Sequence, residues 1–151
     1  HGPAIRGTFD NLAFLPHLQH MTEEEFEELC NSNPLRREFL KSMGRTGFSE
    51  SEMDESISRL KRAIYRMNGW IEDNSGPWLM GSKMTISDIA IMPVIIRMDD
   101  INLSELWKDF PLIENWLTNI KKTHSFQQTY YFGSLLTEKY PHLKKMGKKN
   151  E

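Results

Sequence analysis

Residues 76–96 read GPWLMGSKMTISDIAIMPVII, and they contain the clearest structural pattern in the chain. Thr85 is followed three residues later by Asp88, so each side chain can accept a hydrogen bond from the other's backbone amide. Residues 86–98 are apolar nearly all round, which is typical of a helix that is buried on most sides. The pattern predicts a buried central helix over residues 85–98, with its start fixed by Thr85 and Asp88.

Capping boxes with flanking apolar residues predict two further helix starts, at Thr22 and Ser49. A weaker box begins at Ser125. After Ser49, apolar residues recur at gaps of three and four, which predicts a helix of about six turns that ends before Gly76. Shorter helical segments are predicted over residues 9–18, 35–43 and 104–108 and from Pro111 onward. No alternating strand pattern is present, so the sequence predicts an all-α fold.

Composition excludes several classes of protein. The chain has 151 residues, enough for one domain, with 38% apolar and 26% charged residues. Its net charge of −2 disfavours nucleic acid or anionic lipid as a partner. No apolar run is long enough to span a bilayer. The lone cysteine, Cys30, suits a reducing cytoplasm, so we expect a cytoplasmic protein.

The two ends of the chain stand apart from the predicted fold. The start, His1-Gly2-Pro3, has no Met and resembles a tag remnant or an excised fragment. Residues 143–151 are rich in lysine and predict a disordered basic tail. We therefore predict one helical domain over residues 3–142.

Gly81, Thr85 and Asp88 resemble the core signature of the glutathione transferase C-terminal domain, in which a loop glycine precedes the capped central helix. The resemblance covers most of the chain from Asn11. It continues in the next segment, at Leu106-Trp107, Phe110-Pro111, Trp116 and Phe126. A finer resemblance, to the subgroup of bacterial β-etherases and reductive dehalogenases, rests on Pro34, Arg37, Phe39 and Gly44.

The resemblance implies that glutathione, the co-substrate of the full-length parent, is held by an N-terminal thioredoxin-like domain. We expect that domain to be absent from this chain, because no strand-then-helix unit precedes residue 10. No catalytic, cofactor-binding or metal-binding residue is carried over, and the fragment alone is expected to be inactive. The parent, expected to be a homodimer, would conjugate glutathione to hydrophobic electrophiles or cleave ether or halide bonds.

The resemblance also implies one wall of the pocket for a small hydrophobic electrophile, from the first helix and the C-terminal segment. The candidates from the first helix and the residues after it are Phe14, His17, Leu18 and Met21, and those from the C-terminal segment are Tyr130 and Tyr131. The alternative is that these side chains serve only packing, as most apolar helix positions do.

Other chemistry-bearing residues favour ordinary roles. His17 and His20 share helical spacing, but two ligands are too few for zinc. Cys30 follows a glutamate-rich run that raises a thiol pKa, which indicates an inert cysteine. Asp99-Asp100 is interpreted as a loop after the central helix. The four tryptophans (70, 78, 107 and 116) are interpreted as packing residues.

Two functions stay open from the sequence. One is the electrophile-side half of a glutathione-dependent transferase. The other is a non-catalytic interaction module, like the transferase-like helical domains of translation factors and tRNA synthetases. The face that would meet the thioredoxin-like domain is expected to be exposed and to drive self-association.

Overall fold

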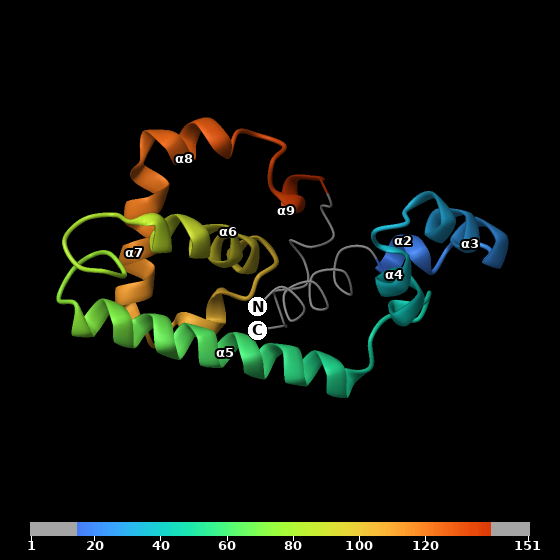
Figure 1. Ribbon diagram of the computed structural model, residues 1–151, viewed down its shortest axis with the longest axis horizontal. Helices are drawn as coiled ribbons and strands as arrows, with labels where there is room; N and C mark the ends of the chain where they lie inside the picture. The colour runs from blue at the N-terminus through green and yellow to red at the C-terminus, as the bar shows by residue number, and fades with distance from the viewer. Residues whose placement is uncertain (1–14, 140–151) are drawn as a thin grey trace, which may run out of the picture. The chain divides into compact units, whose positions relative to one another are not determined.

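The computed structural model describes residues 15–139, and in this part of the chain every regular element is a helix, with no β-strand (Figure 1). Its elements confirm the predicted all-α fold. In chain order they are α2 (Leu15–Leu18), α3 (Glu23–Ser32), α4 (Arg37–Met43), α5 (Glu50–Asp73), α6 (Ile86–Asp100), the 3₁₀ turn η2 (Ser104–Trp107), α7 (Pro111–Lys122), α8 (His124–Thr129) and α9 (Leu136–Lys139).

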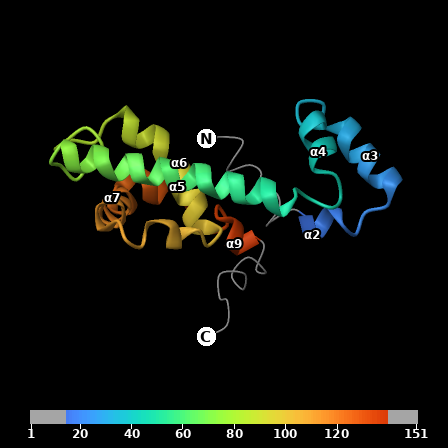
Figure 2. The ribbon, with the colours of Figure 1, turned by 90° about the horizontal axis from the view of Figure 1, so that it is seen from below.

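The chain divides into two compact units, residues 1–57 and 58–151, and each is described by itself. Figures 1 and 2 show helices α2, α3 and α4 of the first unit from two sides. These helices surround a small apolar core. The core side chains, all buried, are Leu18, Phe26, Cys30, Leu40 and Met43. The predicted helix over residues 9–18 is described only in its last turn, α2.

Local hydrogen bonds set the helix starts in this unit where the sequence predicts them. The Thr22 amide donates to Glu25 Oε2 (2.8 Å), and the Glu25 amide donates to Thr22 Oγ1 (3.2 Å). The Ser49 amide and Glu52 carboxylate repeat this arrangement at the start of α5 (2.9 Å). Both capping boxes are therefore confirmed.

The second unit contains α6 to α9 and the later part of α5, whose apolar stripe of Leu60, Ile64, Met67 and Ile71 is buried. Trp107, Ile113, Trp116, Leu117 and Ile120 form the buried face of η2 and α7. The predicted pattern of α5 is confirmed, because every buried position of this helix lies on the apolar stripe that the sequence shows.

Asp88 is a buried polar side chain in the interior of this unit and accepts four hydrogen bonds. It is fully buried, and its Oδ1 accepts hydrogen bonds from the Leu79 amide (2.9 Å) and the Trp116 indole N–H (2.8 Å). Its Oδ2 accepts from the amide (2.8 Å) and the hydroxyl (3.0 Å) of Thr85. Burial alone would raise the pKa of Asp88, but these bonds outweigh it and hold the pKa below its ordinary value.

A tight loop before α6 brings the Leu79 and Thr85 donors to Asp88. Trp78 and Gly81 exchange two backbone hydrogen bonds (3.2 Å each), and Gly81 has a φ of 113°, which favours glycine. A Cβ at Gly76 would lie 2.1 Å from the Gly81 carbonyl oxygen, so only glycine fits there. The Asn74 side-chain amide closes the loop by donating to the Leu79 carbonyl (3.0 Å).

Several predictions about α6 and α8 are wrong in detail. The second half of α6 is largely buried, but its first half exposes Ile86 and Ile89, so the helix is not buried on most sides along its whole length. The helix also continues through Asp99 and Asp100, which the sequence interpretation placed in a loop. At α8 the cap is Thr123 and not Ser125, because the Thr123 hydroxyl accepts the Phe126 amide (3.2 Å) and starts the helix at His124.

The tryptophans also differ from the uniform packing role that we assigned to them. Trp107 and Trp116 are buried and Trp78 is partly buried, but Trp70 near the end of α5 is exposed. Trp70 lies outside the stripe of buried α5 positions, in agreement with its exposure. The predicted tail over residues 143–151 lies outside the described residues.

Candidate functional site

A cavity of about 160 Å³ in the first unit is the first candidate site. It lies among α2, α3 and α4 and the turn that joins α3 to α4. Apolar side chains form most of its wall, and three polar side chains complete it. The lining residues are His17, Leu18, Met21, Leu29, Asn33, Arg36, Leu40 and Met43.

Backbone anchors hold the polar and apolar parts of this wall in place. Arg45 donates from Nη1 to the Met21 carbonyl oxygen (2.6 Å), which fixes the end of the α2 segment. The side-chain NH₂ group of Asn33 donates to the Leu29 carbonyl oxygen (2.9 Å) at the end of α3. The Arg36 guanidinium lies over the Phe39 ring at 5.8 Å. Hydrogen bonds therefore fix the helix ends that form the wall of the first cavity.

Cys30 lies in the core beside this cavity and is not part of its lining. Its side chain is fully buried. Burial raises the pKa of the Cys30 thiol, and the negative charge of Glu27 raises it further. A protonated, inaccessible thiol is a poor nucleophile, so the geometry supports the inert role that the sequence indicates.

A second cavity, of about 430 Å³, lies within the second unit, where the end of α6 meets α7, α8 and the segment before α9. Its apolar side chains are Ile96, Phe126 and Leu135. Its polar lining consists of Asp99, Asp100, Asn102, Lys121, Tyr130 and Thr137. The volume is in the range that small-molecule sites occupy.

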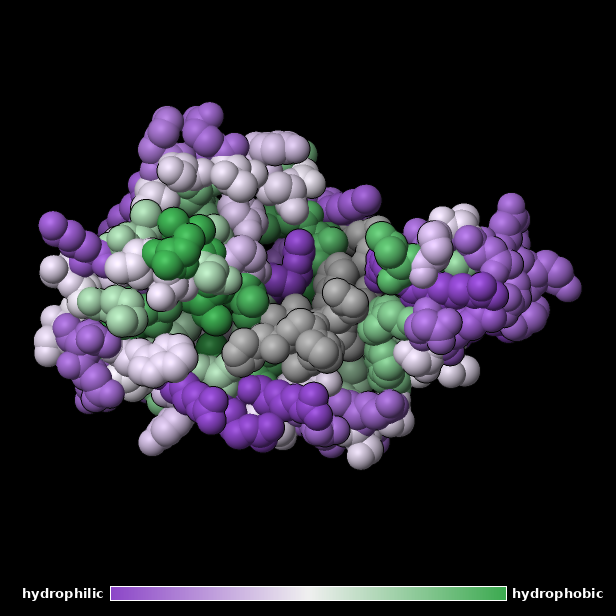
Figure 3. Space-filling view, in the orientation of Figure 1, coloured by the Kyte–Doolittle hydropathy of each residue, from purple (hydrophilic) through white to green (hydrophobic). Residues whose placement is uncertain are grey.

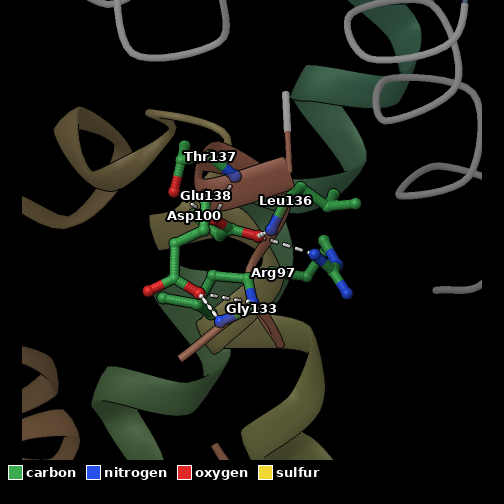
Figure 4. A network of polar contacts seen from close by, with 7 residues as sticks. Arg97, Asp100, Gly133, Leu136, Thr137 and Glu138 are labelled. Carbon is green, nitrogen blue, oxygen red and sulfur yellow. Dashed lines mark hydrogen bonds and ion pairs between the residues drawn. The ribbon is translucent and has the colours of Figure 1, made fainter. Parts of the chain in front are cut away.

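Asp100 holds the C-terminal wall of the second cavity (Figure 4). Its carboxylate is buried and accepts hydrogen bonds from the amides of Leu136 (2.7 Å) and Thr137 (3.1 Å) and from the Thr137 hydroxyl (2.7 Å). Arg97, one helical turn earlier, forms an ion pair with it at 2.6 Å. One side chain at the end of α6 thus fixes a segment more than thirty residues later in the sequence.

Glu138 forms hydrogen bonds within the same C-terminal segment. Its Oε2 accepts the Gly133 amide (2.6 Å) and the Leu135 amide (3.3 Å), so both carboxylates in Figure 4 bind backbone amides. Because these bonds tie residues 133–138 to one another and to α6, the segment has a defined position beside the cavity.

Aromatic and charged side chains complete the second cavity. The rings of Phe126 and Tyr130 stack with centroids 4.5 Å apart and an interplanar angle of 13°. Lys121 pairs with Asp99 at 2.8 Å. Burial raises the pKa of the Tyr130 phenol, the Arg97 charge opposes this rise, and the phenol is neutral at physiological pH.

The structure separates the six predicted pocket residues. His17, Leu18 and Met21 line the first cavity, and Tyr130 lines the second. Tyr131 is exposed and lines neither of the two, and Phe14 lies outside the described residues. Leu18 also belongs to the buried core, so packing and cavity lining coincide at that residue.

Sequence interpretation missed Asp100, Lys121 and Thr137 at the second cavity. Asp100 was noted as half of an acidic pair, but the amides that it binds in the C-terminal wall are 36 and 37 residues away, and no local spacing reveals them. The positions of Asn33 and Arg36 in the first cavity were missed for a different reason. They follow α3 in a turn, where the helical pattern gives no direction for the side chains.

The described residues contain neither a cluster of metal ligands nor a helix that could span a membrane. Residues 15–139 contain no group of three or more His, Cys, Asp or Glu side chains that could hold a metal ion. His17 lines the first cavity, and His20 is exposed. Within the same residues, no helix combines the length and the apolar character that crossing a membrane requires.

An exposed apolar face covers the first half of α6, where Figure 3 shows a green patch. Ile86 is 76% exposed and Ile89 is 49% exposed, and Met80 and Met84 in the preceding loop are exposed too. Ile86 and Ile89 are three residues apart and so share one side of the helix. We call these four residues the α6 patch. A patch of this kind on a folded protein indicates a contact surface.

Comparison with known proteins gives two curated relatives. The chain is similar to Glutathione S-transferase-like protein tpcF of Aspergillus fumigatus, with 30% identity over 86 residues that cover 46% of this chain and 37% of that protein. It is also similar to Glutathione S-transferase omega-like 2 of Schizosaccharomyces pombe, with 22% identity over 98 residues that cover 58% of this chain and 31% of that protein. The chain thus spans about a third of the length of these relatives.

None of the solved structures matches the chain significantly. Residues 33–124, more than half of the chain, match the family described as Glutathione S-transferase, C-terminal domain. This match contains α4 to α7, the Gly81 loop and the Asp88 network on which the sequence resemblance rests. The chain belongs to the glutathione S-transferase C-terminal domain family.

Proposed function

We propose that this chain supplies the electrophile-binding side of a glutathione-dependent transferase. The observation that carries the proposal is the first cavity, because His17, Leu18 and Met21 were selected as pocket residues from the family resemblance and line one cavity together. Membership of the transferase C-terminal domain family supports the same role.

The size and lining of the first cavity favour a small hydrophobic electrophile. A cavity of about 160 Å³ compares with the roughly 150 Å³ apolar cavity that accepts benzene, so one aromatic ring or a short alkyl group fits. Leu18, Leu40 and Met43 offer apolar contacts, and Arg36 offers a positive charge at the wall. That charge would stabilise an electron-withdrawing substituent or a departing anion.

The reaction proposed for the whole protein is attack of the glutathione thiolate on an electrophilic carbon. A carbon–sulfur bond forms, the bond from that carbon to a halide or an ether oxygen breaks, and the leaving group takes the electron pair. Cleavage of ether or halide bonds is the activity of the subgroup that Pro34, Arg37, Phe39 and Gly44 resemble. Simple conjugation to an activated electrophile is the broader form of the proposal.

A thioredoxin-like domain would hold glutathione and lower the pKa of its thiol. The α6 patch supports this part of the proposal, because it offers an apolar surface for another domain. We further propose that the full-length protein is a homodimer and acts in the cytoplasm, where a protein with a single cysteine suits the reducing conditions.

Calorimetry with glutathione tests the proposal directly. Glutathione is titrated into the 151-residue chain and into the full reading frame that contains it, and both are assayed for conjugation of 1-chloro-2,4-dinitrobenzene. The proposal expects binding and turnover by the full protein alone. Turnover by neither protein would contradict it.

A cavity-filling variant tests the role of the first cavity in the full protein. Met21→Trp places a large ring at the cavity wall and is expected to raise the KM for the aryl halide while leaving the KM for glutathione unchanged. Leu35→Trp is the matched control, because Leu35 is fully exposed in the same unit and lines neither cavity. Equal KM values for both variants would remove the first cavity from the proposal.

A non-catalytic interaction module is the second candidate function. The observation that favours it is again the α6 patch, which could bind a partner protein. Ile86→Ser with Ile89→Ser would then abolish binding of that partner, and the full protein would neither bind glutathione nor turn over the aryl halide.

A further inference from the structure

The second cavity has the features of a binding site that is separate from the one proposed for the electrophile. We propose that it binds a neutral, planar aromatic compound with a carbonyl oxygen. The proposal stands on the geometry of the second unit alone, so it holds or fails independently of the transferase function.

Charge balance in the cavity favours a neutral ligand. Asp99 is paired with Lys121 at 2.8 Å, and Asp100 is paired with Arg97 at 2.6 Å. Each carboxylate thus has its own cation, and among the described lining residues no net charge remains for a charged ligand to neutralise. A charged ligand would lose its hydration without gaining a new counter-ion, which is unfavourable.

Two of the polar side chains that line the cavity have donor capacity left. Within residues 15–139 the Tyr130 hydroxyl makes no hydrogen bond, and the phenol keeps its proton at physiological pH. Lys121 uses one of its three N–H groups on Asp99. Both residues line the cavity, so a ligand with a carbonyl acceptor can satisfy either donor.

The apolar part of the cavity favours a flat aromatic ligand. Phe126 and Tyr130 are already stacked, and Ile96 and Leu135 complete the apolar lining. A further ring can pack against this pair face to face with an offset, or edge to face. The volume of about 430 Å³ is sufficient for a compound of two fused rings.

Asp100 is the positioning residue of this site. Its own acceptor sites are taken up by Arg97, Leu136 and Thr137, so it has little left for a ligand. By binding the amides of Leu136 and Thr137, Asp100 fixes the C-terminal wall of the cavity, which Leu135 and Thr137 line. Loss of these bonds would release the wall and lower affinity without removing a direct ligand contact.

Fluorescence titration with 6-propionyl-2-(dimethylamino)naphthalene, a neutral aromatic ketone, tests the proposal on the 151-residue chain. We expect saturable binding with a blue-shifted emission. Tyr130→Phe keeps the ring and removes the hydroxyl, so it should weaken binding about threefold to tenfold. The anion 2-naphthoate should bind more weakly than the ketone.

Three further variants separate this site from other surfaces. Tyr131→Phe is the matched control and should bind like the wild type, because Tyr131 is exposed and does not line the cavity. Ile86→Ser with Ile89→Ser removes most of the exposed apolar area of α6 and should also leave binding unchanged. Asp100→Asn should weaken binding and speed amide exchange at Leu136 and Thr137 while the helical circular dichroism is kept.

Three results would overturn the proposal. The first is the absence of saturable binding. The second is unchanged affinity in Tyr130→Phe and in Tyr130→Ala. The third is loss of binding in the Ile86 and Ile89 variant with retention in Tyr130→Ala, which would place the ketone on the α6 patch.

Discussion

Replacing Asp88 by alanine is expected to cost more stability than any other single change to a polar side chain in the second unit. The carboxylate accepts four hydrogen bonds, and its two partners at Oδ1, the Leu79 amide and the Trp116 indole, are buried with it. The two donors of Thr85 lie at the helix start and are only partly buried. After the substitution, water can reach Thr85 more easily than the other two donors.

The magnitude follows from the donors that lose their acceptor. A buried donor without a partner costs about 1–3 kcal/mol, so the Leu79 amide and the Trp116 indole together predict a loss of about 2–6 kcal/mol. Removing a buried charge returns part of that loss, but the lowered pKa of Asp88 shows that its hydrogen bonds outweigh its desolvation. Because domains unfold at only about 5–15 kcal/mol, Asp88→Ala brings the chain close to unfolding.

Urea unfolding followed by circular dichroism at 222 nm measures this loss without depending on tryptophan emission. Asp99→Ala is the control, because it removes a carboxylate near the end of the same helix from a partly exposed ion pair with Lys121. Such pairs contribute about 1 kcal/mol or less. Trp116→Phe removes one of the two buried donors and should lower the cost of the Asp88 substitution in the double variant.

Equal destabilisation by Asp88→Ala and Asp99→Ala would refute the reasoning, since it would mean that the buried donors find other partners. The pH dependence gives a second check. A carboxylate whose folded pKa is lowered stabilises the fold above its unfolded pKa, about 3.9 for aspartate, and loses that contribution as the pH falls through the folded pKa. The advantage of the wild type over Asp88→Asn should be constant near neutral pH and shrink in acid.

Three other predictions concern single residues. Gly76→Ala should destabilise the chain by about 1 kcal/mol or more, because its Cβ would meet the Gly81 carbonyl at 2.1 Å. Gly69→Ala, near the end of α5, should stabilise it by about 0.5–1 kcal/mol, because a Cβ there meets nothing within 4 Å; urea midpoints of the two variants decide this. Cys30 should resist iodoacetamide in the native chain and react after unfolding, since its thiol is buried with a raised pKa, and rapid native labelling followed by mass spectrometry would contradict this. Asp100→Ala should speed amide hydrogen exchange across residues 133–139 relative to α7, and uniform exchange in both would remove the anchoring role of Asp100.

The parts of the fold that the sequence predicts are those whose causes lie close together in the chain. The Thr22 and Ser49 boxes depend on partners three residues away, and the structure has both. The stripes of α5 and α7 are likewise visible as spacings of three and four. Ser125 fails because Thr123, two residues earlier, accepts the Phe126 amide and starts the helix at His124, and spacing alone cannot choose between neighbouring caps.

The candidate sites are less predictable because their residues meet through tertiary structure. His17, Leu18 and Met21 were found together because they lie within one short segment. Asp100 and Thr137 were not, because they are 37 residues apart and their hydrogen bond depends on the fold. The exposed side of α6 was missed for a related reason, since an apolar residue in a sequence does not show whether anything covers it.

Helix α6 joins these observations in one physical argument. Near its start, Asp88 is buried with the loop before the helix and with Trp116 of α7, so the carboxylate stabilises the packing of the unit. At the last residue of the helix, the buried Asp100 carboxylate binds the Leu136 amide at the start of α9 and lines the second cavity. The two carboxylates are twelve residues, or about 18 Å, apart along the helix, which is far enough for their effects to be independent. A change at the cavity end of α6 can therefore alter binding without weakening the packing that Asp88 maintains.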